Sequence, residues 1–240
     1  MNLKKQRENL LLDKYKVLAL IPARSGSKRL PKKNLLKFCG KPLIAHSFIE
    51  AKKSKIIDDV IISSDDKKIL ELAKYYDIKV PFIRPKSLAN NKSNMFSVIE
   101  HTLKNIKDNY DILILLQPTS PLRKVEDIDN ALLSLKKNNA KMLVSANKIG
   151  QPQEWIFKPT NKMFLGSSSI NFTSGKRSQD YTESYIINGA IFIAHINELL
   201  KSKTFFNPKT FVFIMELKSS IDIDNKEDFL LAEYFMKNNI

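Results

Sequence analysis

The residues best suited to chemistry fall in two short stretches of the 240-residue chain. The first, IPARSGSKRLPKKN at residues 21–34, contains one glycine, two serines and five cations. Free backbone N–H groups and cationic side chains in such a loop can converge on a polyphosphate. The spacing matches neither a P-loop nor the Gly-x-Gly-x-x-Gly fingerprint. The stretch therefore predicts a phosphate site of another kind. A solvated lysine-rich turn is the alternative, with Arg29 and Lys32 facing solvent.

The second stretch, SIDIDNKEDF at residues 220–229, contributes carboxylates. Asp222 and Asp224 alternate with isoleucines, so both face the same side if the segment is extended. Two clustered carboxylates suit Mg²⁺, or Mn²⁺, because such ions complete their shell with phosphate oxygens and water. We expect Asp224 to be the principal ligand and Asp222 its partner. The alternative is a capping box of Asp224 with Glu227, and Asp228 is assigned to the surface.

Alternating strands and helices are expected to carry these stretches. Apolar runs typical of buried strands recur along the chain, with amphipathic helical patterns between them. This alternation predicts an α/β fold, a Rossmann-like and mostly parallel sheet with helices on both faces. Ser93 is a candidate cap for one of these helices. The expected strands cover residues 16–21, 59–63, 78–83, 112–116, 142–146, 185–193 and 210–217.

Ligands of such sheets bind beyond the carboxyl ends of the strands. The basic loop, the turn at Arg84 and the segment QPTSPLR all begin at such ends, so we expect them to meet in one crevice. Gln117, Thr119 and Ser120 would offer amide and hydroxyl groups there. Arg123 is interpreted either as a contact to phosphate or carboxylate, or as a charge at the start of a helix.

The alternation stops at residue 147. From there to residue 184 the chain is rich in polar residues and proline and has no helical period, and so long a loop is unusual in a compact domain. We therefore predict a small β-rich arm at residues 147–184, with short strands near 154–158 and 163–165. The α/β domain would comprise residues 15–146 and 185–240, preceded by an N-terminal extension, residues 1–14.

Composition narrows the class of protein. The net charge is +15, and 34 of the 40 cations are lysines. Such charge permits non-specific binding to nucleic acid, so a basic nucleic-acid-binding protein is the alternative of a different class. No zinc-finger, RNP or helix-turn-helix pattern supports specific recognition. No apolar run approaches the ~20 residues of a membrane span, no secretory signal is recognisable, and Cys39 is the only cysteine. A cytoplasmic protein with no membrane partner is the simplest interpretation.

Four motifs in order resemble those of one family. The basic loop, LQPTSPLR at residues 116–123, NGAIFI at 188–193 and SIDIDNKEDF at 220–229 are similar to the signatures of the CMP-sialic acid synthetases (acylneuraminate cytidylyltransferases). The similarity covers roughly residues 15–238. It implies that CMP is transferred from CTP to a nonulosonic acid, with release of pyrophosphate and with Mg²⁺ as cofactor.

The resemblance also implies roles for the nucleotide site. Arg24 and Lys33 would hold the triphosphate, assisted by Ser27, and both are expected in a solvated loop. Together with Asp224 they are the candidate catalytic residues. Asn34 would contact the nucleotide near its α-phosphate, and Arg84 would lie near the cytidine.

The acceptor sugar would lie further out, where Gln117, Thr119 and Ser120 supply amide and hydroxyl groups. The family places a pair of aromatics against the N-acyl group. Phe205 and Phe206 match these positions, although an ordinary core pair is an equal alternative, and Phe192 would form an apolar wall. The family arm exchanges between subunits of a homodimer, so Arg177 would meet the sugar carboxylate, in trans.

The acceptor itself is narrowed by one departure from the family pattern. Many sialic acid enzymes have a lysine after the proline of the arm, whereas Gln153 follows Pro152 here. A less charged pocket favours legionaminic acid, with an acylamino group on its tail, over N-acetylneuraminate. Pseudaminic acid enzymes are less similar around NGAIFI. A CMP-KDO synthetase is the alternative within the same chemistry, and the aromatic pair and NGAIFI argue against it.

Overall fold

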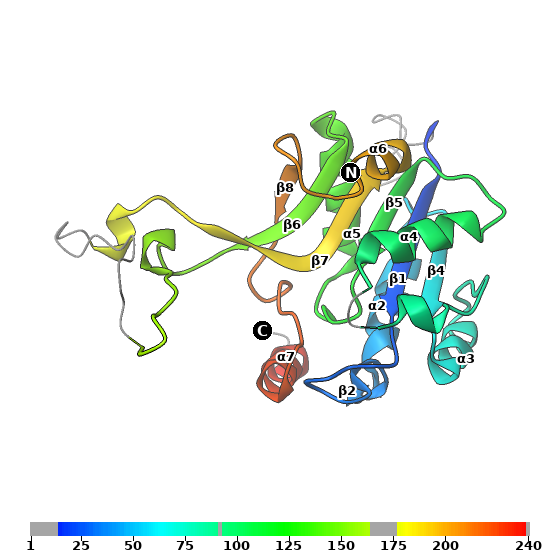
Figure 1. Ribbon diagram of the computed structural model, residues 1–240, viewed down its shortest axis with the longest axis horizontal. Coiled ribbons are helices and arrows are strands. Elements are labelled where there is room, and N and C mark those ends of the chain that lie inside the picture. The colour runs from blue at the N-terminus through cyan, green and yellow to red at the C-terminus, as the bar shows by residue number, and fades with distance from the viewer. Residues whose placement is uncertain (1–13, 91–92, 164–176, 239–240) are drawn as a thin grey trace.

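The computed structural model describes residues 14–90, 93–163 and 177–238. Its centre is a six-stranded sheet in the order β4-β1-β5-β7-β6-β8 (Figure 1). The strands are β1 (Val17–Ala23), β4 (Asp59–Ser64), β5 (Ile112–Leu116), β6 (Met142–Lys148), β7 (Tyr185–His195) and β8 (Phe211–Ile214). A separate small hairpin joins β2 (Lys37–Phe38) and β3 (Lys41–Pro42).

The sheet is mostly parallel, as expected. β1 pairs in parallel with β4 and β5, and β6 pairs in parallel with β8. Only β7 runs in the opposite direction among these strands, antiparallel to both β5 and β6. The carboxyl ends of the other strands therefore share one edge.

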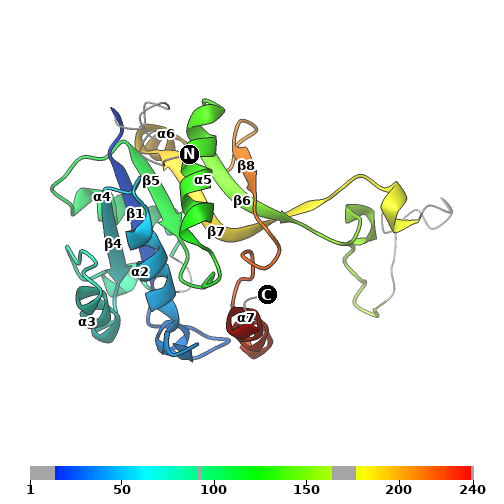
Figure 2. The same ribbon diagram turned by 180° about the vertical axis from the view of Figure 1, so that it is seen from behind.

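Helices cover both faces of the sheet, which confirms the predicted fold class. Figure 2 shows α2 and α5 on one face, where Phe48 and Leu132 enter the main core. α4 and α6 lie on the other face and contribute Ile99 and Leu199 to a second core cluster. The α-helices are α2 (Leu43–Lys53), α3 (Lys67–Tyr75), α4 (Met95–Lys104), α5 (Val125–Lys137), α6 (Ile196–Ser202) and α7 (Lys226–Asn238). Short 3-10 helices are η2 (Lys33–Leu35), η3 (Lys86–Leu88), η4 (Gln153–Trp155) and η5 (Ser178–Asp180).

Two local expectations were wrong. The strand predicted at residues 78–83 is reduced to a single bridge between Ile61 and Lys79. Pro81 interrupts it, since proline has no N–H to donate to a ladder. Asn94, not Ser93, caps α4, and its side-chain oxygen accepts a hydrogen bond from the Ser97 N–H at 2.8 Å.

Between β6 and β7 the chain leaves the sheet as a long projection (Figure 1). The two strands stay paired as far as Lys148 and Tyr185. The strand predicted near residues 154–158 is absent: η4 and irregular backbone occupy that region, which two prolines bracket. Of the strand predicted at residues 163–165, only Met163 lies within the described part, and it has a positive φ of 65°.

No helix in the described ranges is long and apolar enough to cross a membrane.

Candidate nucleotide-binding site

The basic loop, the Arg84 turn and the loop after β5 meet in one crevice, as the topology predicted. Its volume is about 450 Å³. The segment before α7 closes the crevice, although it is not a strand end. Of the predicted site residues, Arg24, Ser27, Lys33, Asn34, Arg84, Gln117, Thr119, Asp222 and Asp224 line it.

The basic loop is held at its start by a carboxylate from the neighbouring strand end. The Asp65 carboxylate accepts hydrogen bonds from the Ser25 N–H at 2.9 Å and from the Ser25 hydroxyl at 2.6 Å. The adjacent Asp66 has a different role: it is the N-cap of α3, and its carboxylate accepts a hydrogen bond from the Lys68 N–H at 2.9 Å. Asp65 thus fixes the loop that offers cations to the crevice, and it is a positioning residue that sequence reasoning missed.

Lys33 is a buried side chain and not a solvated one. It is 9% exposed, and its Nζ donates to the Ile223 carbonyl oxygen and, at 3.1 Å, to Asp224 Oδ1. Arg29, expected to face solvent, reaches the other oxygen of the same carboxylate, with Nη2 2.6 Å from Asp224 Oδ2. The basic loop and the SIDID segment are therefore joined through one carboxylate.

Asp224 is not the cap of α7. The Asn225 side-chain oxygen accepts from the Asp228 N–H at 2.8 Å, and Asp228 Oδ2 accepts from the Asn225 N–H at 3.1 Å. This reciprocal pair is a capping box one residue beyond the predicted position. Asp228, assigned to the surface from sequence, is therefore a capping residue, and the Asp224 carboxylate is left for the crevice.

Asp222 lies at the crevice mouth, beside Asp224. The residue keeps an exposed edge, but surrounding protein atoms desolvate its carboxyl, and this burial raises its pKa. The charges of Asp224 and Asp228 raise the pKa further, while Thr119 and Lys33 oppose the rise. A carboxylate pair in which each charge raises the energy of the other favours a cation between them.

Arg84 is positioned by the end of β4. Its Nε donates to the Ser63 hydroxyl at 3.0 Å, and its Nη2 donates to the Ser63 carbonyl oxygen. The pKa of the guanidinium is lowered to about 10, mainly by burial; the charge of Asp65 opposes this shift and the charge of Arg24 contributes to it. The two arginines therefore face one crevice as neighbouring positive charges.

The side-chain oxygen of Asn34 is available to a ligand. Its Nδ2 donates to the Arg24 carbonyl oxygen at 3.3 Å, but its buried Oδ1 has no hydrogen-bond partner among the described residues. A buried unpaired acceptor is unusual in a folded protein unless a ligand or water meets it.

The loop after β5 is organised by Arg123. This arginine is 1% exposed and donates to the Gln117 and Ala190 carbonyl oxygens and to the Ser47 hydroxyl, at 3.0, 2.7 and 2.8 Å. Burial lowers the pKa of its guanidinium to about 10. Arg123 is thus neither a phosphate contact nor a helix-start charge. It stabilises the loop that presents Gln117.

The NGAIFI motif begins with two residues that position the site. Asn188 Nδ2 donates to the Ser220 hydroxyl at 2.8 Å, which attaches the SIDID segment to the sheet. Gly189 has a φ of 74°, a conformation that favours glycine, and the Gln117 side chain lies 3.7 Å from where a Cβ would stand. The pairing of β6 and β7 shifts register at this point.

The sequence of the chain matches a family model described as cytidylyltransferase over residues 18–229. The chain belongs to the cytidylyltransferase family. It is therefore a nucleotidyltransferase, and the resemblance seen in the four motifs is confirmed.

Three relatives illustrate the range of the family. The chain is 33% identical to a pseudaminic acid cytidylyltransferase of Campylobacter jejuni, over 93% of this chain and 97% of that protein. It is equally similar, at 33% with the same coverage, to a CMP-N,N′-diacetyllegionaminic acid synthase of Legionella pneumophila. An N-acylneuraminate cytidylyltransferase of Escherichia coli is 35% identical over 90% of this chain and 51% of that protein.

Among solved structures, similarity extends to more distant enzymes. A CMP-2-keto-3-deoxy-manno-octonic acid synthetase complexed with CTP superposes with a TM-score of 0.69 at 18% identity, covering 94% of this chain and 100% of that one. A 4-diphosphocytidyl-2C-methyl-D-erythritol synthase from Anaerococcus prevotii gives 0.65 at 15% identity, covering 93% and 99%. These likenesses support the fold.

Of the residues predicted for the acceptor of this cytidylyltransferase, Gln117 and Thr119 line the crevice. The others, Ser120, Arg177, Phe192, Phe205 and Phe206, lie outside its lining. Phe192 packs against Phe205 and Phe206, with ring centroids 5.4 and 6.1 Å apart. Phe205 is 8% exposed and Phe206 is 53% exposed, so only the second offers a free face. Ser120 is buried and its hydroxyl lacks a hydrogen-bond partner in the described part of the chain. Arg177 lies in the projection, paired with Asp180 at 3.6 Å.

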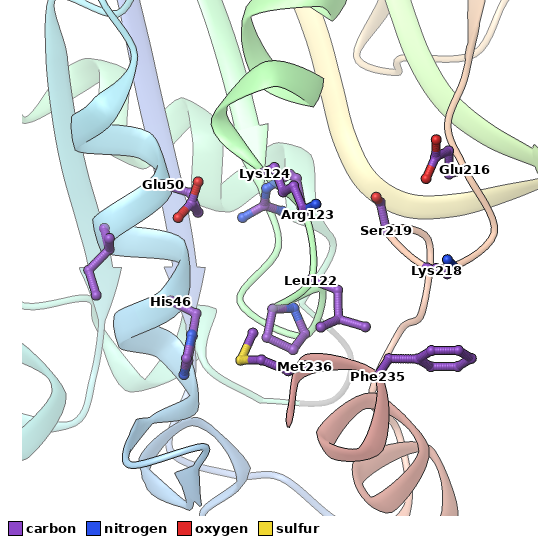
Figure 3. A pocket seen from close by; sticks show the side chains of 12 residues that line it. His46, Glu50, Leu122, Arg123, Lys124, Glu216, Lys218, Ser219, Phe235 and Met236 are labelled. Atoms are coloured by element: carbon purple, nitrogen blue, oxygen red, sulfur yellow. The ribbon is translucent and has the colours of Figure 1, made fainter. Parts of the chain in front are cut away.

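A second pocket, of about 430 Å³, borders the same loop through residues 121–124 (Figure 3). Leu122, Phe235 and Met236 give it apolar walls, while Lys124, Glu216 and Lys218 give it charges of both signs. Arg123 is the one residue among the sequence candidates that lines it.

Proposed function

We propose that this cytidylyltransferase transfers CMP from CTP to a nonulosonic acid and releases pyrophosphate. The observation that carries the proposal is the crevice itself, where cations of the basic loop lie beside two carboxylates at the parallel strand ends. Its relatives at about one-third identity over most of the chain are named for pseudaminic, legionaminic and acylneuraminic acids. The similarity to the octonic acid synthetase is more distant.

In this reaction the hydroxyl oxygen on the anomeric carbon of the acid attacks the α-phosphorus of CTP. A phosphorus–oxygen bond forms as the hydroxyl proton is lost to solvent, the bond from the α-phosphorus to the bridging oxygen breaks, and pyrophosphate leaves with that electron pair. Because both reactants are anions, catalysis depends on neutralising and positioning charge. Arg24 and Lys33 would hold the triphosphate, with Ser27 and the loop backbone assisting, and Arg84 would lie nearer the cytidine.

Asp222 and Asp224 fit a Mg²⁺ site, with Mn²⁺ as a substitute. Both line the crevice, and Asp224 is free of capping duty. Burial, with the charge of Asp224 as a further cause, raises the pKa of Asp222, and a bound cation would stabilise its ionised form. No group of three or more His, Cys, Asp or Glu side chains suited to a metal occurs in the described ranges. Two carboxylates suffice for an ion that takes its remaining ligands from phosphate and water. Such an ion would neutralise phosphate charge.

We further propose that residues 147–184 form a dimerisation arm and that Arg177 serves the partner's site. The support is an apolar surface on the projection: Trp155, Ile156 and Phe157 are 41%, 62% and 43% exposed. An exposed run of this kind is typical of an interface. Light scattering would test the homodimer. Mixing Arg177→Ala with Asp224→Asn chains would test the trans arrangement, because only mixed dimers would contain one complete site.

Within this class we propose legionaminic acid as the acceptor, because Gln153 and not a lysine follows Pro152, which makes the arm less charged. Sequence identity does not separate the candidates, since the pseudaminic and legionaminic relatives are equally similar. The enzyme would act in the cytoplasm on CTP, without a nucleic-acid partner.

Pyrophosphate release from CTP, measured against a panel of nonulosonic acids and KDO, tests the function. We expect turnover with at least one nonulosonic acid, little with KDO, and little when UTP or ATP replaces CTP. Equal turnover with all nucleotides, or a preference for KDO, would contradict the proposal. Filter binding of nucleic acid across a salt series tests the other class, because phosphate-driven binding weakens steeply with salt.

A further inference from the structure

Arg29 and Lys33 occupy the two oxygens of the Asp224 carboxylate in different ways. Lys33 approaches from inside: its side chain is 11% exposed, and it also bonds the Ile223 carbonyl. Arg29 approaches from the solvent side, with its side chain 68% exposed and Nη2 2.6 Å from Oδ2. One contact is part of the fold, and the other can be exchanged without disturbing a buried group.

From this geometry we infer that Arg29 is a displaceable counter-ion, which weakens the binding of a divalent cation to Asp224 until nucleotide arrives. The inference rests on the proposed metal site. A guanidinium 2.6 Å from Oδ2 and a divalent cation on the same oxygen are like charges in close proximity, so each weakens the binding of the other. Arg29 is therefore a positioning residue for the reaction, acting through Asp224.

The formal charges of Arg29, Lys33 and the two aspartates, Asp222 and Asp224, support this role. Arg29 and Lys33 carry two positive formal charges and the two aspartates carry two negative ones, so the four groups sum to zero. A divalent cation gains little from a neutral cluster. If Arg29 turns toward a polyphosphate in the same crevice, which it also lines, the remaining three groups carry a net negative charge. Nucleotide would then recruit both the arginine and the cation.

The test is binding of Mn²⁺ to the full chain without nucleotide, followed by the electron paramagnetic resonance signal of free Mn²⁺. Because exposed ion pairs are weak, we expect Arg29→Gln to bind Mn²⁺ about two- to fivefold more tightly than wild type. Arg29→Lys keeps the charge and should stay near the wild-type value. Lys28→Gln is the matched control, since it removes one charge from the same loop and the same crevice.

Equal affinities for wild type and Arg29→Gln, or no measurable binding by Arg29→Gln, would overturn the inference. So would equal tightening by Lys28→Gln, which would show a general effect of loop charge. Asp224→Asn distinguishes a failure of the metal assignment from a failure of the inference about Arg29. If it binds Mn²⁺ as wild type does, the metal assignment fails along with the inference. If it loses binding while Arg29→Gln changes nothing, only the inference fails. Pyrophosphate release tests the proposed reaction independently.

Discussion

The crevice and the pocket of Figure 3 both border the loop after β5, but their arginines have different roles. In the crevice, Arg29 is mostly exposed and Asn34 keeps a buried acceptor unpaired, so groups remain for a ligand. In the pocket, Arg123 is buried, and both of its Nη atoms donate within the protein, to two backbone carbonyls and the Ser47 hydroxyl, although its Nε has no partner in the described chain. Arginine in a loop at a strand end is therefore not enough to indicate a phosphate site. What its donors already bond decides the role.

The largest effect should follow loss of the structural arginine. Arg123→Met leaves three acceptors without their donor, and we expect the free energy of unfolding to fall by about 3 kcal/mol in urea titrations. Arg29→Met is the matched control: its exposed ion pair should be worth less than about 1 kcal/mol. If Arg123→Met is as stable as wild type but binds CTP poorly, Arg123 contacts the nucleotide and the contrast fails.

Asp224→Asn should give the next largest effect, on activity. It removes the charge proposed to hold Mg²⁺, and we expect pyrophosphate release to fall at least ~100-fold, about 2.7 kcal/mol, with partial rescue by raised Mg²⁺ or Mn²⁺. Thermal stability should be nearly unchanged, because Asn225 and Asp228 cap α7, and an amide oxygen can still accept from Lys33, which also keeps the Ile223 carbonyl. Glu227→Gln removes an exposed charge nearby and should leave activity within about twofold. Near-wild-type turnover of Asp224→Asn at low Mg²⁺ would place the metal elsewhere.

The adjacent residues Asp65 and Asp66 have different roles: the first positions the basic loop of the site, and the second caps α3. Asp65→Ala releases Ser25 and should lower kcat/KM for CTP about tenfold, or ~1.4 kcal/mol, with little loss of stability. Asp66→Ala removes the cap of α3 and should cost about 1 kcal/mol of stability with activity unchanged. The reverse pattern would show that Asp65 acts through the helix.

Much of this architecture could be predicted because it depends on local patterns. The apolar run ILILL gave a strand whose bounds match β5, and parallel topology placed the basic loop beside the QPTSPLR segment. Asp65 and Asn188 were missed because their partners lie 40 and 32 residues away in sequence. A signal was present: two adjacent aspartates cannot both cap one helix.

The regions predicted least well have few tertiary partners. Around residues 154–158 the apolar side chains suggested a strand, but they are exposed and pair with no described strand. The burial of Arg123 and Lys33 was not predicted, because both side chains bond buried carbonyl groups that no sequence pattern marks.

The smallest predicted effect is on KM for CTP, and its test compares a lysine of the crevice with a lysine of the second pocket. Lys28 lines the crevice and Lys218 lines the second pocket. An exposed cation that meets a triphosphate contributes modestly, so Lys28→Gln should raise KM for CTP about two- to fivefold, an effect that weakens with salt. Lys218→Gln removes the same charge but faces no proposed phosphate, and it should change KM by less than about 1.5-fold at physiological ionic strength. If both variants raise KM equally and salt abolishes both effects, CTP responds to the net charge of the protein and not to the crevice. If only Lys218→Gln has an effect, the second pocket binds the nucleotide, and the assignment of the two surfaces is reversed.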